Sequence, residues 1–368
     1  MENSARLSAK INSFFTVGSS ERYLLLHGHA AQVLRLLPAE SVHACMTSPP
    51  YWSQREYSGP SGLGGESSFE EYAEHLVDIL NEVWRVLRDD GSLWLNLGDT
   101  YRRKNLIGVP WRVTFALQEQ GWILRNAIVW DKMKGNPCNA RDKLRNVYEF
   151  VFHLVKREQY YYDLDTIRNP PGKPYRKNGR IVTPTGVSGV KYERQIRTST
   201  ELSDEEKAAA LQALAQALHK VETGEMPDFR MIIRGTQRAT HSDSVRYSGR
   251  AEELRKRGFR ILPYHKRGTK PGDVWRIVPE DRWRRDGHFA VYPVELCEMP
   301  IKATCPPDGI VLDPFVGTGT TMVAALQLQR RAIGVDTSAE YLQVAQERVT
   351  EVVRKTAQYN LELPLEWR

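Results

Sequence analysis

The run Thr47-Ser48-Pro49-Pro50-Tyr51-Trp52 combines hydrogen-bond acceptors with a rigid backbone. Two consecutive prolines cannot continue a central strand, so we expect the chain to leave a sheet here in a stiff, extended turn. In that turn the Ser48 hydroxyl and the Pro49 carbonyl can accept both N–H groups of an exocyclic amino group. This draws the nitrogen toward tetrahedral geometry and aims its lone pair at a methyl donor. Tyr51 can stack on a base flipped out of a duplex. The catalytic candidates are Ser48, Pro49, Pro50 and Tyr51.

A glycine-rich turn near the C-terminal end is the second stretch that can bind a ligand. An apolar run at 310–312 enters it, and the helix-forming run 322–326 leaves it, so the glycines let a ligand approach a helix N-terminus. Asp313 at its start can accept from a ligand ammonium group, and Asp336, 23 residues later, can bind a ribose hydroxyl pair. The third glycine of dinucleotide folds is missing, which favours S-adenosylmethionine over NAD. The cofactor-binding candidates here are Asp313, Pro314, Phe315, Gly317, Thr318, Gly319, Thr320, Thr321, Asp336 and Thr337.

Alternating strands and helices are expected to position both stretches. Period-two and short apolar runs predict strands, and apolar residues at helical spacing predict helices between them. The helix that begins at Ser68 has a capping box with Glu71. This alternation predicts a doubly wound, three-layer α/β fold around a mixed, mostly parallel sheet. The expected strands are 23–26, 41–46, 92–97, 122–130, 148–156, 310–312 and 331–336, and the expected helices are 31–37, 68–87, 110–120, 322–326 and 340–353.

Charge is concentrated in the middle of the chain. Residues 163–287 hold 26 Lys and Arg against 17 Asp and Glu, whereas the rest of the 368-residue chain is slightly acidic. A basic middle inside a near-neutral frame is typical of a polyanion-binding insertion, although a solvated basic surface has the same composition. Within this basic region, residues 169–200 are predicted to be loop and residues 204–221 an Ala/Leu-rich helix. We expect that helix to pack against the protein and not to enter a DNA groove.

Cysteine spacing and hydropathy exclude several classes of protein. Cys45, Cys138, Cys297 and Cys305 lie far apart, which supports neither a disulfide framework nor a zinc site, and no metal is expected. The sequence contains no apolar run of transmembrane length and no signal-peptide pattern, so a cytoplasmic location is expected.

The motifs together resemble the S-adenosylmethionine-dependent DNA amino-methyltransferases, which methylate cytosine N4 or adenine N6. The order of motifs, with the Pro-Pro turn first and the cofactor turn last, is similar to the circularly permuted β group. Further segments that look like the family lie at 91–101, 128–132 and 333–336. The run 288–293 is similar to the segment that lines the methionine end of the cofactor, which adds His288, Phe289 and Ala290 to the cofactor-binding candidates.

The resemblance implies a class I methyltransferase fold and a division of the chain. We expect an N-terminal arm at 1–21, a catalytic half at 22–163, a target-recognition insertion at 164–286, a cofactor half at 287–356 and a tail at 357–368. The order of motifs also predicts that 22–163 and 287–350 form one sheet, with Ser48 and Gly317 close together at its carboxyl edge. The implied partners are double-stranded DNA, at the nucleoid of a prokaryote, and a cognate restriction endonuclease; a monomer and a dimer are both open. Candidate DNA-binding residues are Arg176, Lys177, Arg194, Arg234, Arg238, Arg246, Lys266 and Arg267.

The first residue of the Ser-Pro-Pro-Tyr motif indicates the target base. Serine there is associated with N4-cytosine enzymes, and Asp or Asn with N6-adenine enzymes, so the expected activity is site-specific methylation of cytosine N4. N6-adenine methylation is the alternative, and an RNA amino-methyltransferase and a non-catalytic homologue also stay open. Two positions depart from the family pattern, since His29 and His43 stand where an acid is usual. We expect His27, His29 and His43 to be packing or loop residues.

Overall fold

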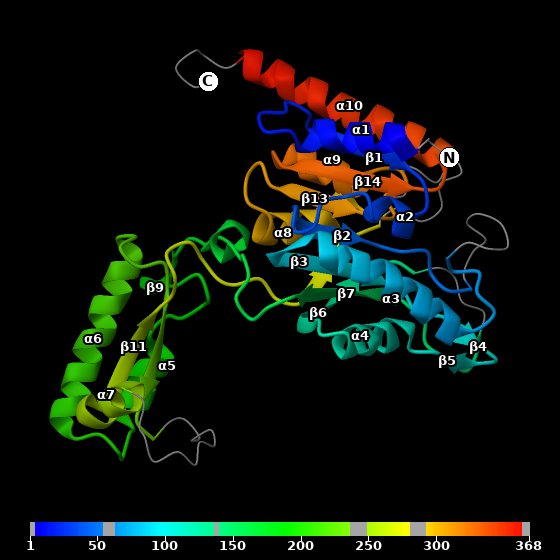
Figure 1. The fold of residues 1–368 in the computed structure, drawn as a ribbon. Coiled ribbons are helices and arrows are strands. Elements are labelled where there is room, and N and C mark those ends of the chain that lie inside the picture. Colours follow the sequence, from blue (N-terminus) through cyan, green and yellow to red (C-terminus); the bar gives the residue numbers. More distant parts are fainter. Residues whose placement is uncertain (1–3, 54–62, 136–139, 236–248, 280–291, 363–368) are drawn as a thin grey trace. The chain divides into compact units, whose positions relative to one another are not determined.

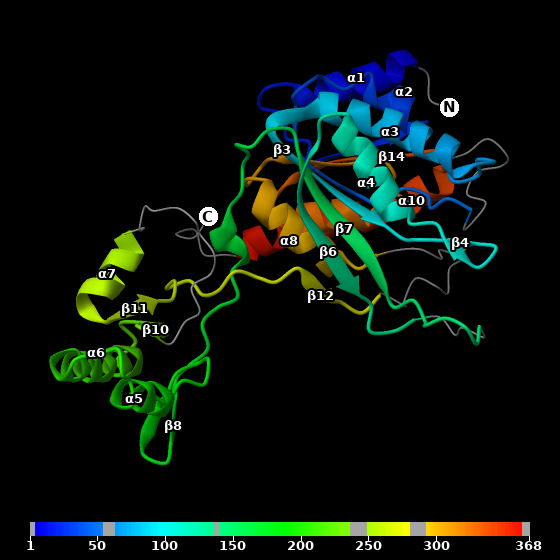
Figure 2. The ribbon, with the colours of Figure 1, turned by 90° about the horizontal axis from the view of Figure 1, so that it is seen from below.

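The computed structural model describes residues 4–53, 63–135, 140–235, 249–279 and 292–362. The chain divides into two compact units (Figures 1 and 2), one formed by Met1–Thr166 with Gly272–Arg368 and the other by Ile167–Pro271. The second unit is narrower than the insertion expected at 164–286. The reason is that residues 274–276 form a strand of the first unit's sheet.

The first unit is built on an eight-stranded mixed sheet, counted over the described residues. Among these strands β7 alone runs antiparallel to its neighbours, and every other pairing is parallel. The mixed, mostly parallel sheet predicted from the sequence is therefore confirmed. The strand order is β1 (Tyr23–His27), β14 (Arg331–Asp336), β13 (Ile310–Asp313), β2 (Val42–Thr47), β3 (Leu87–Leu97), β7 (Tyr148–Val155), β6 (Ile123–Asp131) and β12 (Val274–Arg276).

Side chains that alternate along the strands feed two separate hydrophobic cores, one on each face of the sheet. On β2, Ala44 and Met46 belong to one core and Cys45 to the other. The fold therefore has the three layers that the sequence predicts, as Figure 1 shows. The core that contains Cys45 is covered by α1 (Ser4–Phe15), α2 (Ala30–Leu34), α3 (Phe69–Val86) and α4 (Val109–Glu119), and the opposite core by α8 (Val294–Thr304), α9 (Thr320–Gln327) and α10 (Ala339–Glu362). Within the described ranges, no helix has the length and apolar character needed to cross a membrane.

The N-terminal segment corrects one expectation. Residues 1–21 read as a loose arm, but α1 buries Leu7, Ile11 and Phe14 in the first core. The Arg331 guanidinium holds the helix end, because it lies 3.9 Å from the centre of the Phe14 ring and donates to the Phe14 carbonyl. Three apolar residues among polar ones form one narrow stripe, which is too weak a pattern to predict a packed helix.

The first strand also lies on the unexpected side of the sheet. Residues 22–163 were expected to form the catalytic half, but β1 pairs with β14 in parallel, with His27 opposite Asp336. The Gly28 amide donates to the Asp336 carbonyl at 2.9 Å. The N-terminal strand thus completes the cofactor side of the sheet, and the catalytic side begins at β2.

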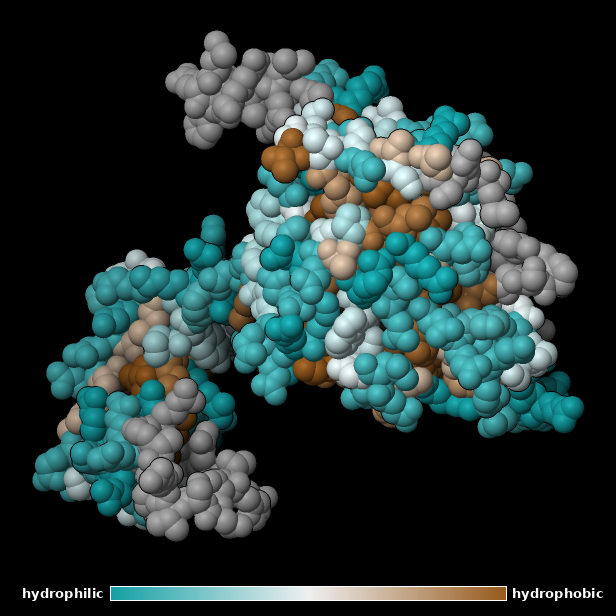
Figure 3. All heavy atoms as spheres, in the orientation of Figure 1, coloured by the Kyte–Doolittle hydropathy of each residue, from teal (hydrophilic) through white to brown (hydrophobic). Residues whose placement is uncertain are grey.

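The second unit has a small core of its own. Helix α6 (Asp204–Glu222) begins at a Ser203–Glu206 capping box and buries Leu214 and Val221 against the hairpin of β10 (Phe229–Ile233) and β11 (Phe259–Pro263). Part of the stretch expected to be loop at 169–200 is regular, since it contains β8 (Tyr175–Lys177), β9 (Arg180–Val182) and α5 (Val190–Arg197); α7 (Gly249–Arg257) precedes β11. In the view of Figure 3 hydrophilic residues cover most of each unit's surface.

A buried histidine lies in the middle of the sheet. His153 on β7 stacks on Trp94 with ring centres 4.2 Å apart, and its Nε2 lies 3.1 Å from the Ser92 hydroxyl. Its Nδ1 is buried with no hydrogen-bond partner among the described residues. Burial is the main cause that lowers the pKa of His153 to about 3, and the nearby positive charge of Arg125 is a smaller one.

This low pKa predicts that acid destabilises the first unit. Histidine binds a proton near pH 6.5 in the unfolded chain and only near pH 3 in the folded protein. The neutral side chain therefore makes its full contribution to the unfolding free energy above pH 6.5, and this contribution falls by about 1.4 kcal/mol per pH unit between those two values. When the pH falls from 7 to 5, we expect the unfolding free energy of the unmodified protein to fall by about 2 kcal/mol more than that of His153→Phe. Urea unfolding followed by tryptophan fluorescence measures it, with the exposed His219→Gln as control. Equal pH dependence in all three proteins would contradict the assignment.

Candidate active site

The glycine turn between β13 and α9 is shaped by close packing beneath it. A Cβ on Gly319 would lie 3.0 Å from the Cβ of Ala345, and the positive φ of +87° also excludes most side chains. A Cβ on Gly334 of β14 would lie 2.5 Å from the Met322 sulfur. Gly317 differs, because its added Cβ would meet no described atom within 4 Å. Gly319 and Gly334 therefore serve packing, while Gly317 borders open space.

Asp313 is a buried carboxylate that accepts four hydrogen bonds. Its Oδ1 accepts from the Thr47 hydroxyl at 2.6 Å and the Phe315 amide at 3.1 Å. Its Oδ2 accepts from the Thr321 hydroxyl at 2.6 Å and the Tyr292 hydroxyl at 3.0 Å. Burial raises the pKa of Asp313, and these hydrogen bonds oppose the rise. Since a carboxylate offers about four acceptor positions, the side chain binds the protein's own donors here, and a ligand ammonium group would have to displace one of them.

Asp336 links the glycine turn to the end of the neighbouring strand. Its Oδ2 accepts from the Gly317 amide and its Oδ1 from the Ser338 amide, both at 2.8 Å. Burial raises the pKa of Asp336, while hydrogen bonds from backbone amides lower it. The carboxylate is half-buried beside the open space at Gly317, where a ribose hydroxyl pair was expected to bind.

Helix α10 supplies a residue that the sequence motifs do not reveal. One Arg348 guanidinium nitrogen donates to the Thr318 carbonyl at 2.7 Å and lies 3.1 Å from the hydroxyls of Thr318 and Thr320. Three positions earlier on the same helix, Ala345 contacts Gly319. Arg348 therefore fixes the turn from behind. In the sequence, the only indication of this role is that Ala345 and Arg348 lie on one face of a predicted helix. That spacing does not reveal which part of the protein the face contacts.

The Pro-Pro turn leaves the carboxyl end of β2 and is braced by two neighbours. The Tyr51 ring packs on Gly98, where an added Cβ would lie 2.6 Å from ring atom Cε2, so only glycine fits beneath it. Tyr72 of α3 donates to the Pro50 carbonyl at 3.0 Å. The Ser48 hydroxyl donates to the Tyr51 hydroxyl at 3.1 Å. One face of the Tyr51 ring is thus occupied by the protein.

Hydrogen bonds join the two motifs at the ends of their strands. Thr47, directly before Ser48, donates to Asp313 of the cofactor turn, and Thr321 lies 3.2 Å from the Met46 carbonyl. Strands β2 and β13 are parallel neighbours, so their carboxyl ends adjoin at one edge of the sheet. The juxtaposition of the two turns, which follows from the permuted order of motifs, is confirmed.

Some expected site residues are not described by the structure. His288, Phe289 and Ala290 lie outside the described residues, and so do Arg238 and Arg246. The other cofactor candidates all belong to the turn or to the end of β14 beside it. Pro314, Thr318, Thr320 and Thr321 are buried, Phe315 is half-buried and Thr337 is exposed; the Thr337 carbonyl lies 3.0 Å from His27 Nε2.

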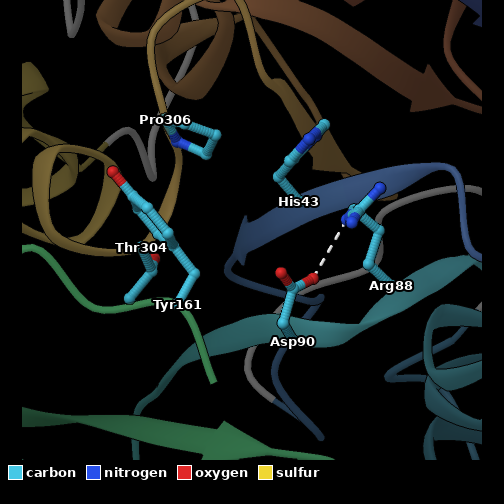
Figure 4. Close-up of a pocket in the computed structure, with 6 residues that line it drawn as sticks. All are labelled: His43, Arg88, Asp90, Tyr161, Thr304 and Pro306. Atoms are coloured by element: carbon cyan, nitrogen blue, oxygen red, sulfur yellow. Dashed lines mark hydrogen bonds and ion pairs between the residues drawn. The ribbon is translucent and has the colours of Figure 1, made fainter. Parts of the chain in front are cut away.

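The histidine at position 43 lies far from this edge. It stands at the amino end of β2, and its Nδ1 accepts from the Ile310 amide at 3.0 Å. Burial and the positive charge of Arg88 lower the pKa of His43, and the negative charge of Asp90 acts in the opposite direction. Figure 4 shows His43 beside the Arg88–Asp90 ion pair in a pocket of about 170 Å³ that Tyr161, Thr304 and Pro306 also line. The departure at this position therefore leaves the two functional turns unchanged. His29 is an exposed residue that directly precedes α2 as its N-cap.

Two of the candidate DNA-binding residues are committed to ion pairs within the second unit. Arg176 pairs with Glu222, and Arg234 pairs with Glu206 of the α6 capping box. Arg234 also donates to the carbonyls of Glu201 and Arg255, which makes it a structural clamp between α6 and its neighbours. The remaining described candidates are exposed: Lys177, Arg194, Lys266 and Arg267.

Comparison with known proteins agrees with this geometry. A DNA methylase family model, for N6 and N4 methyltransferases, matches residues 42–347. The chain is 32% identical to the Type II methyltransferase M.SfiI of Streptomyces fimbriatus, over 87% of this chain and 89% of that one. It is 30% identical to the Type II methyltransferase M.Cfr9I of Citrobacter freundii, over 90% and 91%.

The fold also resembles that of solved structures. The PvuII DNA methyltransferase (cytosine-N4-specific) superimposes with a TM-score of 0.53 at 16% identity, and the match covers 92% of this chain and 96% of that one. At that identity the likeness shows the fold alone. The extent of the family match and the order of the two motifs along one sheet lead to one conclusion: the chain belongs to the β group of the S-adenosylmethionine-dependent DNA amino-methyltransferases, which comprises N4-cytosine and N6-adenine enzymes.

Proposed function

We propose that the protein transfers a methyl group from S-adenosylmethionine to N4 of a cytosine within a short sequence of double-stranded DNA. The observation that carries the proposal is the hydrogen bond between Thr47 and Asp313, because it ties the Ser48 turn to the edge where the cofactor turn lies. The choice of cytosine rests on serine, a neutral acceptor, at the first position of the Ser-Pro-Pro-Tyr motif.

The cofactor turn fits S-adenosylmethionine. Gly317 leaves room for a ligand over the N-terminus of α9, and Asp336 offers a carboxylate beside that room. Asp313 and Arg348 hold the turn rigid from below and behind. When bound, the cofactor supplies an electrophilic methyl group on its sulfonium sulfur.

The Pro-Pro turn supplies the orientation of the nucleophile. The Ser48 oxygen and the Pro49 carbonyl accept the two N–H groups of the target amino group, whose lone pair would otherwise be delocalised into the ring. As the methyl group is attached, the nitrogen releases one proton, which passes to solvent because the Ser48 hydroxyl cannot hold a second proton. Tyr51 stacks on the extruded base with the ring face that does not pack on Gly98.

None of the three cysteines that the structure describes is suited to attack a ring carbon as a thiolate. Cys45 and Cys297 are buried, and burial raises the pKa of both thiols well above the ordinary value. Burial also raises the pKa of Cys305 to about 12. All three thiols are therefore protonated at neutral pH, whereas the reactive form is the thiolate.

A product analysis tests the target base. DNA incubated with the protein and S-adenosylmethionine is digested to nucleosides and analysed by mass spectrometry, and we expect N4-methylcytosine. N6-methyladenine alone would replace cytosine with adenine as the target. A competition assay with tRNA or rRNA tests the RNA alternative, and cofactor binding without any product would support a non-catalytic homologue.

We also propose that the second unit binds the DNA backbone through its exposed cations. Lys177 and Arg194 are exposed and are not engaged in the ion pairs with acids that hold Arg176 and Arg234. Each phosphate contact releases counterions, so binding weakens as salt rises.

Salt titrations of DNA binding test this surface. Lys177→Ala and Arg194→Ala are each expected to weaken binding to any DNA sequence and to reduce the slope of log K against log salt by about 0.9. The matched control is Lys355→Ala on α10, an exposed lysine outside the second unit. Slopes that stay equal in all the proteins would remove both residues from the DNA surface.

The biological setting follows from the relatives. The two relatives named above are Type II methyltransferases, so we propose that this protein protects its own recognition sequence against a cognate endonuclease. Methylation-aware sequencing of DNA from cells that express the chain identifies the site. DNA modified at that site should resist a co-expressed nuclease of the same specificity.

A further inference from the structure

A charged pair lies beside the Pro-Pro turn, at the adjoining ends of two strands that belong to neither of the two functional turns. Glu149 is the second residue of β7, and Lys132 directly follows β6. The Lys132 ammonium pairs with Glu149 Oε1. Both side chains are largely buried, with 14% of Glu149 and 25% of Lys132 exposed. The other carboxylate oxygen, Oε2, accepts from the Tyr51 hydroxyl at 2.8 Å and from the Asn96 amide at 3.1 Å.

These contacts form a chain of hydrogen bonds that ends at the catalytic serine. Ser48 donates to the Tyr51 hydroxyl at 3.1 Å, and Tyr51 in turn donates to Glu149 at 2.8 Å. Asn96 Oδ1, at 3.2 Å, is a second and longer acceptor for the same tyrosine proton. Glu149 is thus joined to Ser48 through one side chain.

A carboxylate at one end fixes the direction of the whole chain. An ionised carboxylate can only accept, so the single proton of Tyr51 points to Glu149 and the tyrosine oxygen receives the proton of Ser48. Ser48 then presents only lone pairs to the side away from Tyr51. A serine hydroxyl is otherwise free to rotate and to donate, and a donating hydroxyl would oppose the N–H of an amino group.

We infer that Glu149 is a positioning residue that makes Ser48 an obligate hydrogen-bond acceptor through the Tyr51 hydroxyl. The inference rests on the proposed function of Ser48 as the acceptor for the target amino group. It gives the tyrosine of the turn a second role besides stacking, since its hydroxyl transmits the direction of the hydrogen bonds. Lys132 balances the charge of the carboxylate, and the Asn96 amide holds the oxygen that faces Tyr51.

A double-mutant cycle separates this role from a structural one. The variants are Tyr51→Phe, which keeps the ring and removes the hydroxyl, Glu149→Gln, and the two combined. We expect the single-turnover rate of methyl transfer to fall about tenfold in the first and about threefold to tenfold in the second. The Kd values for S-adenosylmethionine and for DNA should change by less than about twofold, because neither group touches them directly.

The decisive measurement is Glu149→Gln in the Tyr51→Phe background. If Glu149 acts through the tyrosine hydroxyl, it has nothing to act on in that background, and the double variant should be no slower than Tyr51→Phe alone. Losses that multiply would overturn the inference, and so would an unchanged rate in Glu149→Gln. Glu158→Gln, an exposed glutamate just beyond β7, is the matched control and should keep the full rate.

Two further controls keep the outcome interpretable. If Glu149→Gln does not fold, Glu149→Asp retains the charge but withdraws it from Tyr51, and the same cycle applies with the same expected coupling. The rates are measured on whichever base the product analysis identifies. Methylation of adenine in place of cytosine would therefore contradict the proposed function and leave the coupling test intact.

Discussion

Replacing Ser48 with alanine is expected to lower the rate of methyl transfer by about two to three orders of magnitude and to leave S-adenosylmethionine binding unchanged. The magnitude is that of removing one preorganised hydrogen-bond partner from a reacting group. Cofactor binding is expected to survive because Ser48 has its described hydrogen bond to Tyr51, whereas the neighbouring Thr47 holds the cofactor turn. Single-turnover kinetics and calorimetric titration measure the two quantities.

Ser53→Ala is the matched control, because Ser53 is an exposed serine in the same turn. It should retain the rate and the affinity of the unmodified protein. Parallel loss of rate and cofactor binding in Ser48→Ala would mean that the turn belongs to the cofactor site. A fully active Ser48→Ala would remove the serine from the mechanism altogether.

Replacing Asp313 with alanine is expected to cost about 3–5 kcal/mol of unfolding free energy and to abolish cofactor binding. The change leaves the hydroxyls of Thr47, Thr321 and Tyr292 and the Phe315 amide without their shared acceptor in a buried place. Each unsatisfied buried donor costs roughly 1–3 kcal/mol before the site relaxes. The turn that Asp313 holds then loses its defined shape.

Urea unfolding and S-adenosylmethionine titration measure these two effects. Asp308→Ala is the matched control, since Asp308 precedes the same strand but is 76% exposed and pairs with Arg22 at the surface. Such a pair contributes about 0–1 kcal/mol. Asp313→Asn should fall between the two, because its amide nitrogen cannot accept. A stable Asp313→Ala protein that binds the cofactor normally would show that the four hydrogen bonds are dispensable.

The parts of the site that could be predicted are those written in consecutive residues. Ser48 to Tyr51 and Asp313 to Thr321 each combine a backbone constraint with a chemical group, so their local shape and chemistry follow from the sequence. Their juxtaposition followed from the order of motifs and the rule that parallel strands end at one edge. The family match confirms the reaction class that these motifs indicated.

The parts that could not be predicted depend on contacts between distant single residues. Glu149 meets Lys132 only because β6 and β7 pair with Trp130 opposite Glu149, and the register of two strands joined by a long connection is not encoded locally. In the sequence, Arg348 cannot be distinguished from the other charged residues of a polar helix, and its role is seen only once α10 is known to pack against the turn. In the second unit, Pro and Gly around α5 (Val190–Arg197) concealed a short helix with a buried Ile196.

The bond between Thr47 and Asp313 also has a consequence for how the protein is made. Its two residues are 266 positions apart in the sequence. Strand β13, which pairs with β2 in the sheet, follows the whole second unit along the chain. At 5–20 residues per second, a ribosome needs roughly 13–50 s to make that interval. During this time β2, apolar on both faces, has an open edge that can pair with another chain. Yield in cells should therefore depend on chaperone supply more strongly than the stability of the finished protein suggests.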